Sequence, residues 1–428
     1  MSTAHMEASS SSTDVEAMSE QELKALLETP AGKLVDCVRR RCVPEEDALL
    51  RNKERALLRL GALYRDESNS QALADVVRSS RPLMEHLAKA KTAKLIRTLL
   101  DYFAVIPKTA EVQIDVTKES IEWAKSEKRI FLKQNLETRL IALHIDCSNY
   151  KEALALITSL LRELKKLDDK MVLTEVHLLE SRVNHALANM PKAKAALTSA
   201  RTAANSIYCP PLLQAQLDMQ SGVLHAEDKD YKTAYSYFFE ALEGLSGQED
   251  PKAVLALKYM LMCKIMLNLP EDVTAIIGGK LAQKYAGPDV DAMKAVASAH
   301  EERSLAAFED LLKRHKKELS DDPIIRNHLS ALYDSLLEQN LVRVIEPFSR
   351  VEISHVAELV RQPVREVENK LSQMILDKVF HGVLDQGAGC LIVYDEPEQD
   401  KTYEATLETI GHISQIVEQL FARTRALA

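Results

Sequence analysis

Apolar residues recur three and four positions apart along most of the chain, which is the spacing that places them on one face of an α-helix. This pattern runs from about Ser19 to Leu319. In its clearest helix pair, the polar run Cys147-Ser148-Asn149 separates the two helices, and the second helix has apolar residues at Ala153, Leu154, Ile157, Leu160, Leu161 and Leu164. The pattern predicts a long series of helices.

A short signature recurs about every 40 residues within this helical region. It consists of Tyr150-x-x-Ala153, Ala193, Tyr231-x-x-Ala234 and Val273. The alanines would let paired helices approach closely, and Pro191 and Pro270 are well placed to open helices, where a missing N–H costs little. Helix pairs repeated at such a period are typical of solenoids that bind proteins. The repeat predicts an all-α, right-handed superhelical, TPR-like solenoid.

The pattern changes after Asp321-Asp322-Pro323. The predicted elements are a helix at 325–339, a strand at 350–353, a helix capped by Ser354 and ending at Val360, a helix from Pro363 to Lys378, and strands at 379–384 and 390–394 joined by a turn at 385–389. This order of helix, strand, two helices and a hairpin is that of a winged-helix domain.

A last helix is predicted from Thr402 to Leu427. Its candidate protein-interaction residues are Ile410, Ile413, Val417 and Leu420, which keep the three-four alternation of a coiled-coil seam. The seam either folds back on the winged helix or pairs with helices of other chains. Its position beyond a completed domain favours the second arrangement.

The predicted domains follow from these changes of pattern. They are a disordered, Ser-rich leader at 1–19, the solenoid at 20–225, a domain at 226–395 that joins the last helical repeats (226–320) to the winged helix (321–395), and the C-terminal helix at 396–428.

Composition agrees with a helical protein that lies outside the secretory pathway. The 428 residues are 46% hydrophobic and include only 12 Gly and 14 Pro. The six cysteines are scattered without a CxxC pair, which favours reduced thiols, and the polar N-terminus lacks the apolar region of a secretory signal. Lysines interrupt the most apolar stretch, 253–269, so a buried helix is expected there and no membrane span. We expect a protein of the cytoplasm and nucleus.

Catalytic, metal and cofactor motifs are missing from the sequence. It has no GxxxxGK, HExxH or GxSxG, and Gly278-Gly279-Lys280 is too short for a phosphate loop. His177 and His185 are too far apart to chelate a metal from one turn. Cys37 and Cys42 flank three arginines, but a solvated basic face is the favoured interpretation there, as it is for the run 313–317. We expect no enzyme, cofactor or metal.

The charge of the winged helix argues against nucleic acid. Its third helix would enter the major groove in a DNA-binding protein, but the outward residues of that helix are expected to be Arg365, Glu366, Glu368, Lys370, Asp377 and Lys378, whose charges cancel. Residues 324–395 contain 7 Lys and Arg against 10 Asp and Glu, a net charge of −3. This net charge would not attract the phosphates of nucleic acid, so the winged helix is expected to dock to proteins.

Several longer segments carry a resemblance to a known family. They are 122–129 (EWAKSEKR), 161–166 (LRELKK), 194–201 (KAALTSAR), 340–351 (NLVRVIEPFSRV), 370–378 (KLSQMILDK) and 384–387 (LDQG). Together with a helical stack that leads into a winged helix, the architecture of PCI domains, they resemble the PCI-family lid subunits of the 26S proteasome regulatory particle.

The resemblance implies a non-catalytic scaffold that supports lid assembly in ubiquitin-dependent protein degradation. It implies that the winged helix of the PCI domain lies beside those of other PCI lid subunits and that the C-terminal helix joins the lid's helical bundle. It also implies that the N-terminal solenoid contacts a core-particle α-subunit and an ATPase subunit and clamps the two particles together. The alternative is a PCI scaffold of the COP9 signalosome, and a nucleic-acid-binding winged-helix protein is a further one.

Overall fold

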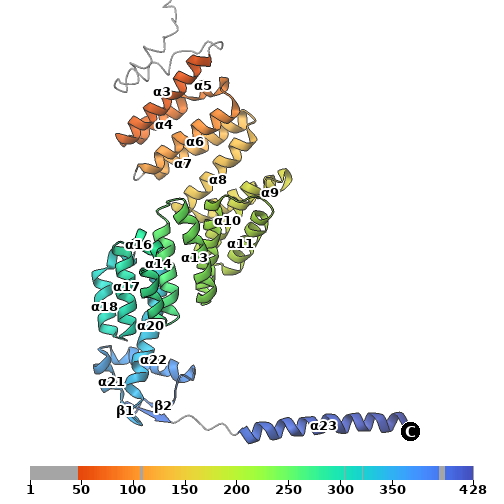
Figure 1. Cartoon of the computed structure of the whole chain (residues 1–428), viewed down its shortest axis with the longest axis vertical. Helices are drawn as coiled ribbons and strands as arrows, with labels where there is room; N and C mark the ends of the chain where they lie inside the picture. Colours follow the sequence, from red (N-terminus) through yellow and green to blue (C-terminus); the bar gives the residue numbers. More distant parts are fainter. Residues whose placement is uncertain (1–46, 107–108, 303, 321, 395–400, 428) are drawn as a thin grey trace, which may run out of the picture. The chain divides into compact units, whose positions relative to one another are not determined.

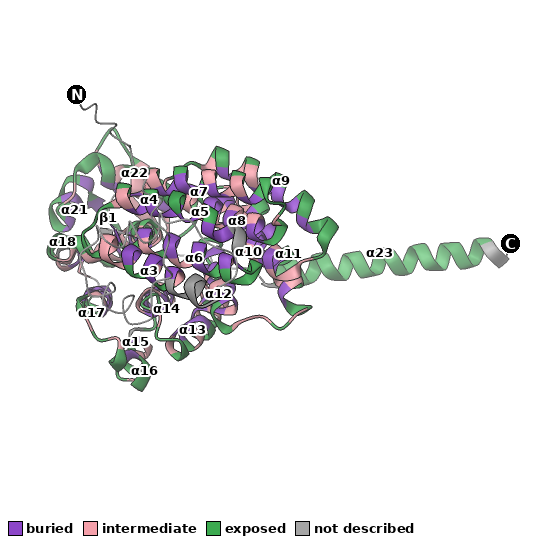
Figure 2. Cartoon of the chain, turned by 90° about the horizontal axis from the view of Figure 1, so that it is seen from above, coloured by how far each residue is buried: buried purple, intermediate pink, exposed green. Residues whose placement is uncertain are grey.

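The computed structural model describes residues 47–106, 109–302, 304–320, 322–394 and 401–427. Within these residues the chain is a series of α-helices with one small β-sheet (Figure 1). Figure 2 shows that most helices bury one side and expose the other, as the periodicity predicts.

Some expectations concern residues outside the described ranges. The predicted leader at 1–19, the helix start near Ser19 and the thiols of Cys37 and Cys42 all lie there.

The described chain divides into two compact units. Unit 1 runs to Lys229 and takes in 243–248, and unit 2 comprises 230–242 and the chain from Glu249 onward. The helices of unit 1 are α3 (Asp47–Asp66), α4 (Ser70–Ser79), α5 (Arg81–His86), α6 (Lys89–Val105), α7 (Ala110–Ser126), α8 (Ile130–Asp146), α9 (Tyr150–Leu167), α10 (Lys170–Ala186), α11 (Met190–Asn205) and α12 (Pro211–Glu227).

Helix α13 (Tyr231–Gly247) contributes residues to both units. The later elements of unit 2 are α14 (Ala253–Met266), α15 (Pro270–Ile277), α16 (Lys280–Lys284), α17 (Pro288–Glu301), α18 (Leu305–Arg314), α19 (Lys316–Ser320), α20 (Pro323–Ile345), β1 (Arg350–Glu352), α21 (Ile353–Val360), α22 (Val364–Leu376), β2 (His381–Asp385), β3 (Cys390–Tyr394) and α23 (Lys401–Leu427).

The residues of the repeated signature occupy equivalent positions in four helices. Ala153, Ala193, Ala234 and Val273 are each fully buried, and each lies three residues after the first residue of α9, α11, α13 or α15. Pro191 and Pro270 lie at the start of α11 and α15, as expected. The prediction of stacked helix pairs is therefore confirmed.

One backbone conformation recurs in the turns of unit 1. Ser68, Lys128, Ser148 and Ala188 have left-handed φ angles between 53° and 61°, each two residues before the next helix begins. The N–H of the following residue closes the turn, as where the N–H of Asn149 donates to the carbonyl of His144 at 2.8 Å. This bond satisfies a helix-end carbonyl, and the conformation disfavours any residue with a Cβ.

We expect Ala188→Gly to raise the free energy of unfolding by about 0.5–1 kcal/mol. The substitution relieves the left-handed strain at φ 56°, and the greater freedom of glycine in the unfolded chain offsets part of the gain. Chemical denaturation measures the change. Ala186→Gly, at the end of α10, is the control and should lose stability. Equal losses in the two variants would contradict the prediction.

The sheet of unit 2 has three antiparallel strands in the order β1-β3-β2. On the central strand, Leu391 is fully buried and lies opposite Val351 on one side and Leu384 on the other. With α20, α21 and α22 the sheet completes the predicted winged helix. The turn after β2 is held by Asp385, whose carboxylate accepts the N–H groups of Gly387 and Ala388.

Three details of the winged helix differ from the sequence-based expectation. Ser354 does not cap α21, because β1 passes directly into the helix at Ile353 and Ser354 already lies inside it. The helix after Pro363 ends at Leu376, because Lys378 adopts a left-handed φ of 58°. The first helix is longer than expected and spans all of α20.

Two polar side chains of α14 bind neighbouring elements of unit 2. The Lys258 ammonium donates to the carboxylate of Asp289 at 2.6 Å and to the backbone carbonyl of Glu318 at 2.9 Å. The Tyr259 hydroxyl donates to Asp322 at 2.5 Å. The rest of α14 is almost entirely buried, so the buried helix predicted here is confirmed. No helix in the described part of the chain combines the length and the apolar character that crossing a membrane requires.

A buried histidine makes the stability of unit 1 depend on pH. His144 in α8 is 1% exposed, and neither ring nitrogen makes a hydrogen bond to a described residue. Burial lowers the pKa of His144, Glu152 at 3.6 Å opposes this effect, and the charge of Lys118 adds to it. The folded state therefore favours the neutral ring.

We expect acidification from pH 7 to pH 5.5 to destabilise the chain partly through His144. The unfolded imidazole takes up a proton near its ordinary pKa of about 6.5, whereas the folded one resists, so stability is lost as the pH falls. In His144→Leu the difference in unfolding free energy between the two pH values should shrink by about 1 kcal/mol. Denaturant titrations at both pH values measure it, and an unchanged difference would contradict this account.

Candidate assembly surfaces

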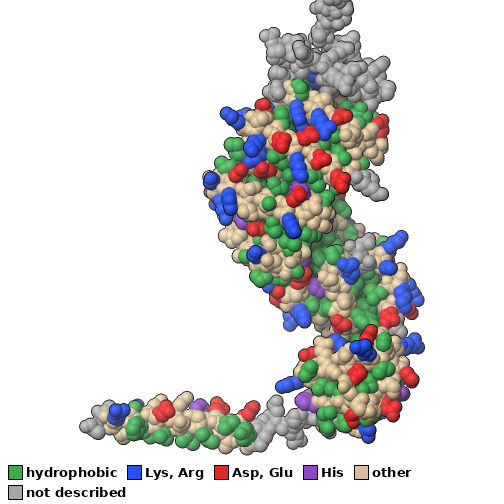
Figure 3. Space-filling model, turned by 180° about the vertical axis from the view of Figure 1, so that it is seen from behind, with side chains coloured by type: hydrophobic (Ala, Val, Ile, Leu, Met, Phe, Trp, Pro, Cys, Tyr) green, Lys and Arg blue, Asp and Glu red, His purple; other side chains and the backbone are tan. Residues whose placement is uncertain are grey.

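Helix α23 presents an apolar face that no described residue covers. Every residue from Thr402 to Arg425 is exposed, as the uniform colour of the helix in Figure 2 shows. The four predicted interaction residues, Ile410, Ile413, Val417 and Leu420, are between 54% and 60% exposed. In Figure 3 hydrophobic side chains gather along one side of the helix. Contiguous exposed apolar surface of this kind marks a protein interaction site.

The apolar face is wider than the predicted seam. It also includes Tyr403, Leu407, Ile416 and Phe421, all more than half exposed. Tyr403 lies one heptad before Ile410 and so extends the seam, whereas a strict heptad pattern does not include Leu407, Ile416 and Phe421. Spacings of three and four connect these residues to the seam, as between Leu407 and Ile410 and between Val417 and Phe421. A face this broad fits a helix that packs against more than one neighbour rather than a two-stranded coiled coil.

The winged helix has apolar side chains on its surface as well as mixed charges. Leu376, Val379 and Val383 are each at least half exposed, close to the end of α22 and the edge strand β2. Lys370 was expected to face outward, but its ammonium lies 2.8 Å from the carboxylate of Glu338 in α20. This pairing removes one of the cations that could have met phosphate. The surface of the winged helix is therefore suited to contacts with other proteins.

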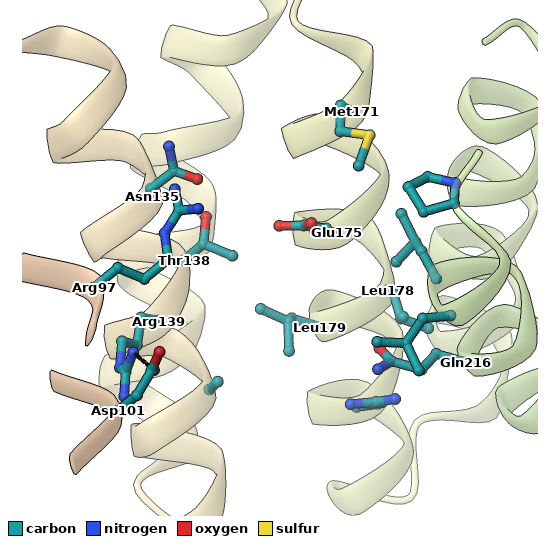
Figure 4. Close-up of a pocket in the computed structure, with 15 residues that line it drawn as sticks. Arg97, Asp101, Asn135, Thr138, Arg139, Met171, Glu175, Leu178, Leu179 and Gln216 are labelled. Atoms are coloured by element: carbon teal, nitrogen blue, oxygen red, sulfur yellow. Dashed lines mark hydrogen bonds and ion pairs between the residues drawn. The ribbon is translucent and has the colours of Figure 1, made fainter. Parts of the chain in front are cut away.

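A pocket of about 470 Å³ in unit 1 is lined by α6, α8, α10 and α12 (Figure 4). One wall is polar and includes Arg97, Asn135 and the ion pair of Asp101 with Arg139. The opposite wall is mainly apolar, and its lining residues include Met171, Leu178, Leu179, Leu212 and Leu213. These residues come from helices far apart in the sequence, so no local motif could have indicated the pocket.

Charged groups inside this pocket are partly desolvated. Burial raises the pKa of Glu175, and the nearby charge of Arg97 opposes the effect. Burial also lowers the pKa of Arg182, against the attraction of Asp146. In Figure 4 Glu175 and Leu179 point from α10 toward the polar wall. With one polar and one mainly apolar wall, the pocket is suited to an amphipathic ligand.

The remaining candidate residues have structural environments. His177 contacts Glu180 at 2.9 Å and His185 contacts Glu227 at 2.6 Å, so each ring has its own carboxylate partner. Burial raises the pKa of the Cys263 thiol to about 12, which makes it a poor nucleophile. Across the described residues, no three His, Cys, Asp or Glu side chains are grouped so that they could hold a metal ion.

Comparison with protein-family models identifies three parts of the chain. Residues 1–147 match the N-terminal domain of 26S proteasome regulatory subunit RPN6, residues 312–395 match the PCI domain, and residues 399–425 match the RPN6 C-terminal helix domain. The predicted architecture of a stacked-helix region, a PCI domain with a small sheet and a C-terminal helix is confirmed.

Several curated proteins are similar over nearly their whole length. The chain is 57% identical to the probable 26S proteasome regulatory subunit rpn6 of Schizosaccharomyces pombe, with 88% of this chain and 90% of the relative aligned. It is 54% identical to the 26S proteasome non-ATPase regulatory subunit 11 homolog of Arabidopsis thaliana, over 88% and 90%. Identity to the 26S proteasome regulatory subunit RPN6 of Saccharomyces cerevisiae is 50%, over 89% of each. The chain therefore belongs to the RPN6 family of 26S proteasome regulatory subunits, also called non-ATPase regulatory subunit 11.

Proposed function

We propose that the chain is a scaffold of the regulatory-particle lid that supports lid assembly and clamps the regulatory particle to the core particle. Its family consists of non-catalytic proteasome subunits, so the chain is not an enzyme. The observation that carries the proposal is the exposed apolar face of α23. Exposing such an apolar face to water is unfavourable, so a helix of 27 residues that presents it is suited to being covered by other helices.

The proposal assigns the face of α23, with Ile410, Ile413, Val417 and Leu420, to a helical bundle formed with other lid subunits. The width of the face supports this assignment, because a bundle covers a helix from more than one side. The winged helix would contact other PCI subunits. Both outer strands of its sheet, β1 and β2, have an edge that no described strand pairs with, and such edges are suited to adding a strand or a neighbouring domain.

The solenoid at 20–225 would contact a core-particle α-subunit and an ATPase subunit. The two-walled pocket of unit 1 supports a binding role for this region. The domain at 226–395 and the helix at 396–428 would supply the lid contacts. With partners of this kind, the chain would act in the cytoplasm and nucleus, without membrane or nucleic acid.

Affinity purification of the tagged full-length chain, followed by mass spectrometry, tests the proposal. We expect lid, ATPase and core-particle subunits in the eluate. Recovery of COP9 signalosome subunits in their place, or of no proteasome subunit, would overturn the proposal. A gel shift with random duplex DNA tests the nucleic-acid alternative, and the acidic winged helix predicts no shift.

A further inference from the structure

A pocket of about 560 Å³ with a basic rim lies in unit 2, between α18–α19 on one side and α20 on the other. Its lining includes three leucines, Leu312, Leu319 and Leu329, of which the last two are buried. Its cations are Lys313, Lys316 and Arg326. From the sequence, the run 313–317 was expected to be only a solvated face, but the structure brings two of its lysines together with an arginine from another helix.

Few acidic side chains among the described residues contact the cations of this pocket. Among the residues that line the pocket, Glu309 is the one acidic residue. Its carboxylate already accepts hydrogen bonds from the Tyr333 hydroxyl and the Gln362 amide, both at 3.1 Å. Lys313 lies 3.7 Å from Asp310, but both side chains are largely exposed, so this pair is weak. Neither Lys316 nor Arg326 forms an ion pair with any described residue.

Stabilisation of the helices themselves does not account for the cluster. A cation in the last turn of a helix is favourable, which explains Lys313 in α18. Arg326 lies near the start of α20, where the helix dipole disfavours a cation. The region 324–395 is acidic overall, with 7 basic against 10 acidic residues. Arg326 therefore adds positive charge, from an acidic region, to the two lysines that line the pocket from α18 and α19.

Both walls of the pocket are held in place before any ligand binds. The ammonium of Lys258 donates to the carbonyl of Glu318 and so fixes α19. The contacts among Glu309, Tyr333 and Gln362 join α18 to α20 and to the residues between α21 and α22, with the Gln362 amide also donating to the Tyr333 hydroxyl at 2.8 Å. A preformed site loses less free energy to ordering when a partner binds.

We propose that this pocket binds a short, acidic amphipathic helix of a partner protein. Arg326, Leu329, Ser330 and Tyr333 share one face of α20 and span roughly 10 Å, about two helical turns. Leucine-like side chains of the partner would insert against Leu312, Leu319 and Leu329, and its carboxylates would meet the three cations. An apolar stripe flanked by charge is the pattern of a helix that binds in a groove.

A fluorescein-labelled peptide of about 15 residues, with leucines at i, i+3/i+4 and i+7 and glutamates at the flanking positions, tests the site. We expect the full-length chain to raise its fluorescence anisotropy at low salt and to bind it more weakly as salt increases. The same peptide with lysine in place of glutamate should not bind. No binding of the glutamate peptide would overturn the proposal.

Charge reversal locates the site. Lys316→Glu combined with Arg326→Glu should weaken binding of the glutamate peptide at least about tenfold. Lys317→Glu combined with Arg343→Glu is the matched control: both residues are exposed, and neither lines the pocket. Equal losses in the two double variants would overturn the proposal. The proposal would also be overturned if the chain bound a labelled DNA duplex more tightly than the glutamate peptide and only the Lys316 and Arg326 variant lost this binding. That result would assign the pocket to nucleic acid.

The assembled protein provides a second test. A photo-crosslinking amino acid in place of Ser330, which is exposed at the pocket, should form a crosslink to an acidic segment of a neighbouring protein in purified complexes. A crosslink to a basic segment would contradict the proposed charge complementarity.

Discussion

Ile413→Asp combined with Val417→Asp should prevent the chain from entering its complex while leaving both compact units folded. The two side chains lie one helical turn apart on the exposed face of α23 and have no folding role among the described residues. Burying carboxylates where apolar contacts are expected should cost about 4 kcal/mol, or about a thousandfold in affinity. Co-purification of the tagged variant with its partners measures the loss.

The matched control is Gln415→Asp combined with Gln419→Asp. It adds the same charge at the same spacing but on the opposite side of α23, where both residues are exposed. This variant should enter the complex normally. Normal incorporation of the Ile413 and Val417 variant would show that α23 is not held through this face.

Asp322→Ala should be among the most destabilising single changes in unit 2. One carboxylate makes two contacts: it accepts the Tyr259 hydroxyl at 2.5 Å, and it caps α20 by accepting the N–H of Ile324 at 3.0 Å. Loss of the cap and of the buried hydroxyl's partner should together cost about 2–4 kcal/mol. Thermal unfolding should show a Tm lower by roughly 5–10 °C.

Two further variants separate these contributions. Tyr259→Phe should cost only about 1 kcal/mol, because Asp322 keeps its contact with α20. Combined with Asp322→Ala it should add little further loss, since the hydroxyl has then already lost its partner. Simple additivity of the two changes would show that the contacts are independent.

Tyr259→Phe should also reduce the loss of stability at high pH. Burial and Asp322 raise the pKa of Tyr259, so the folded state favours the protonated hydroxyl, and the stability that this preference contributes is lost as the pH rises above about 10.

The helices were predictable because their signal is local. The spacing that placed Ala153, Ala193 and Ala234 inside helix pairs is a property of a few consecutive turns, and all three residues are buried at equivalent positions. The hairpin was predictable for the same reason, since Gly389 supplies the left-handed φ of 64° that its turn requires.

The contacts between helices were not predictable in this way. Lys370 was expected to face solvent because nothing near it in the sequence indicates Glu338 on another helix. Four of the left-handed turn residues, Ser68, Lys128, Ser148 and Ala188, were missed because none of these four is a glycine or an asparagine, the residues that usually adopt this conformation. Both pockets combine side chains from separate helices, so they exist only once the chain has folded.

The exposed face of α23 also has a consequence for the supply of the protein. A free copy must keep Tyr403, Leu407, Phe421 and the four seam residues in water. Such a surface promotes aggregation, and the tendency rises steeply with the concentration of unassembled chain. Synthesis in step with the partners, or prompt degradation of surplus copies, would therefore be a physical requirement of this sequence.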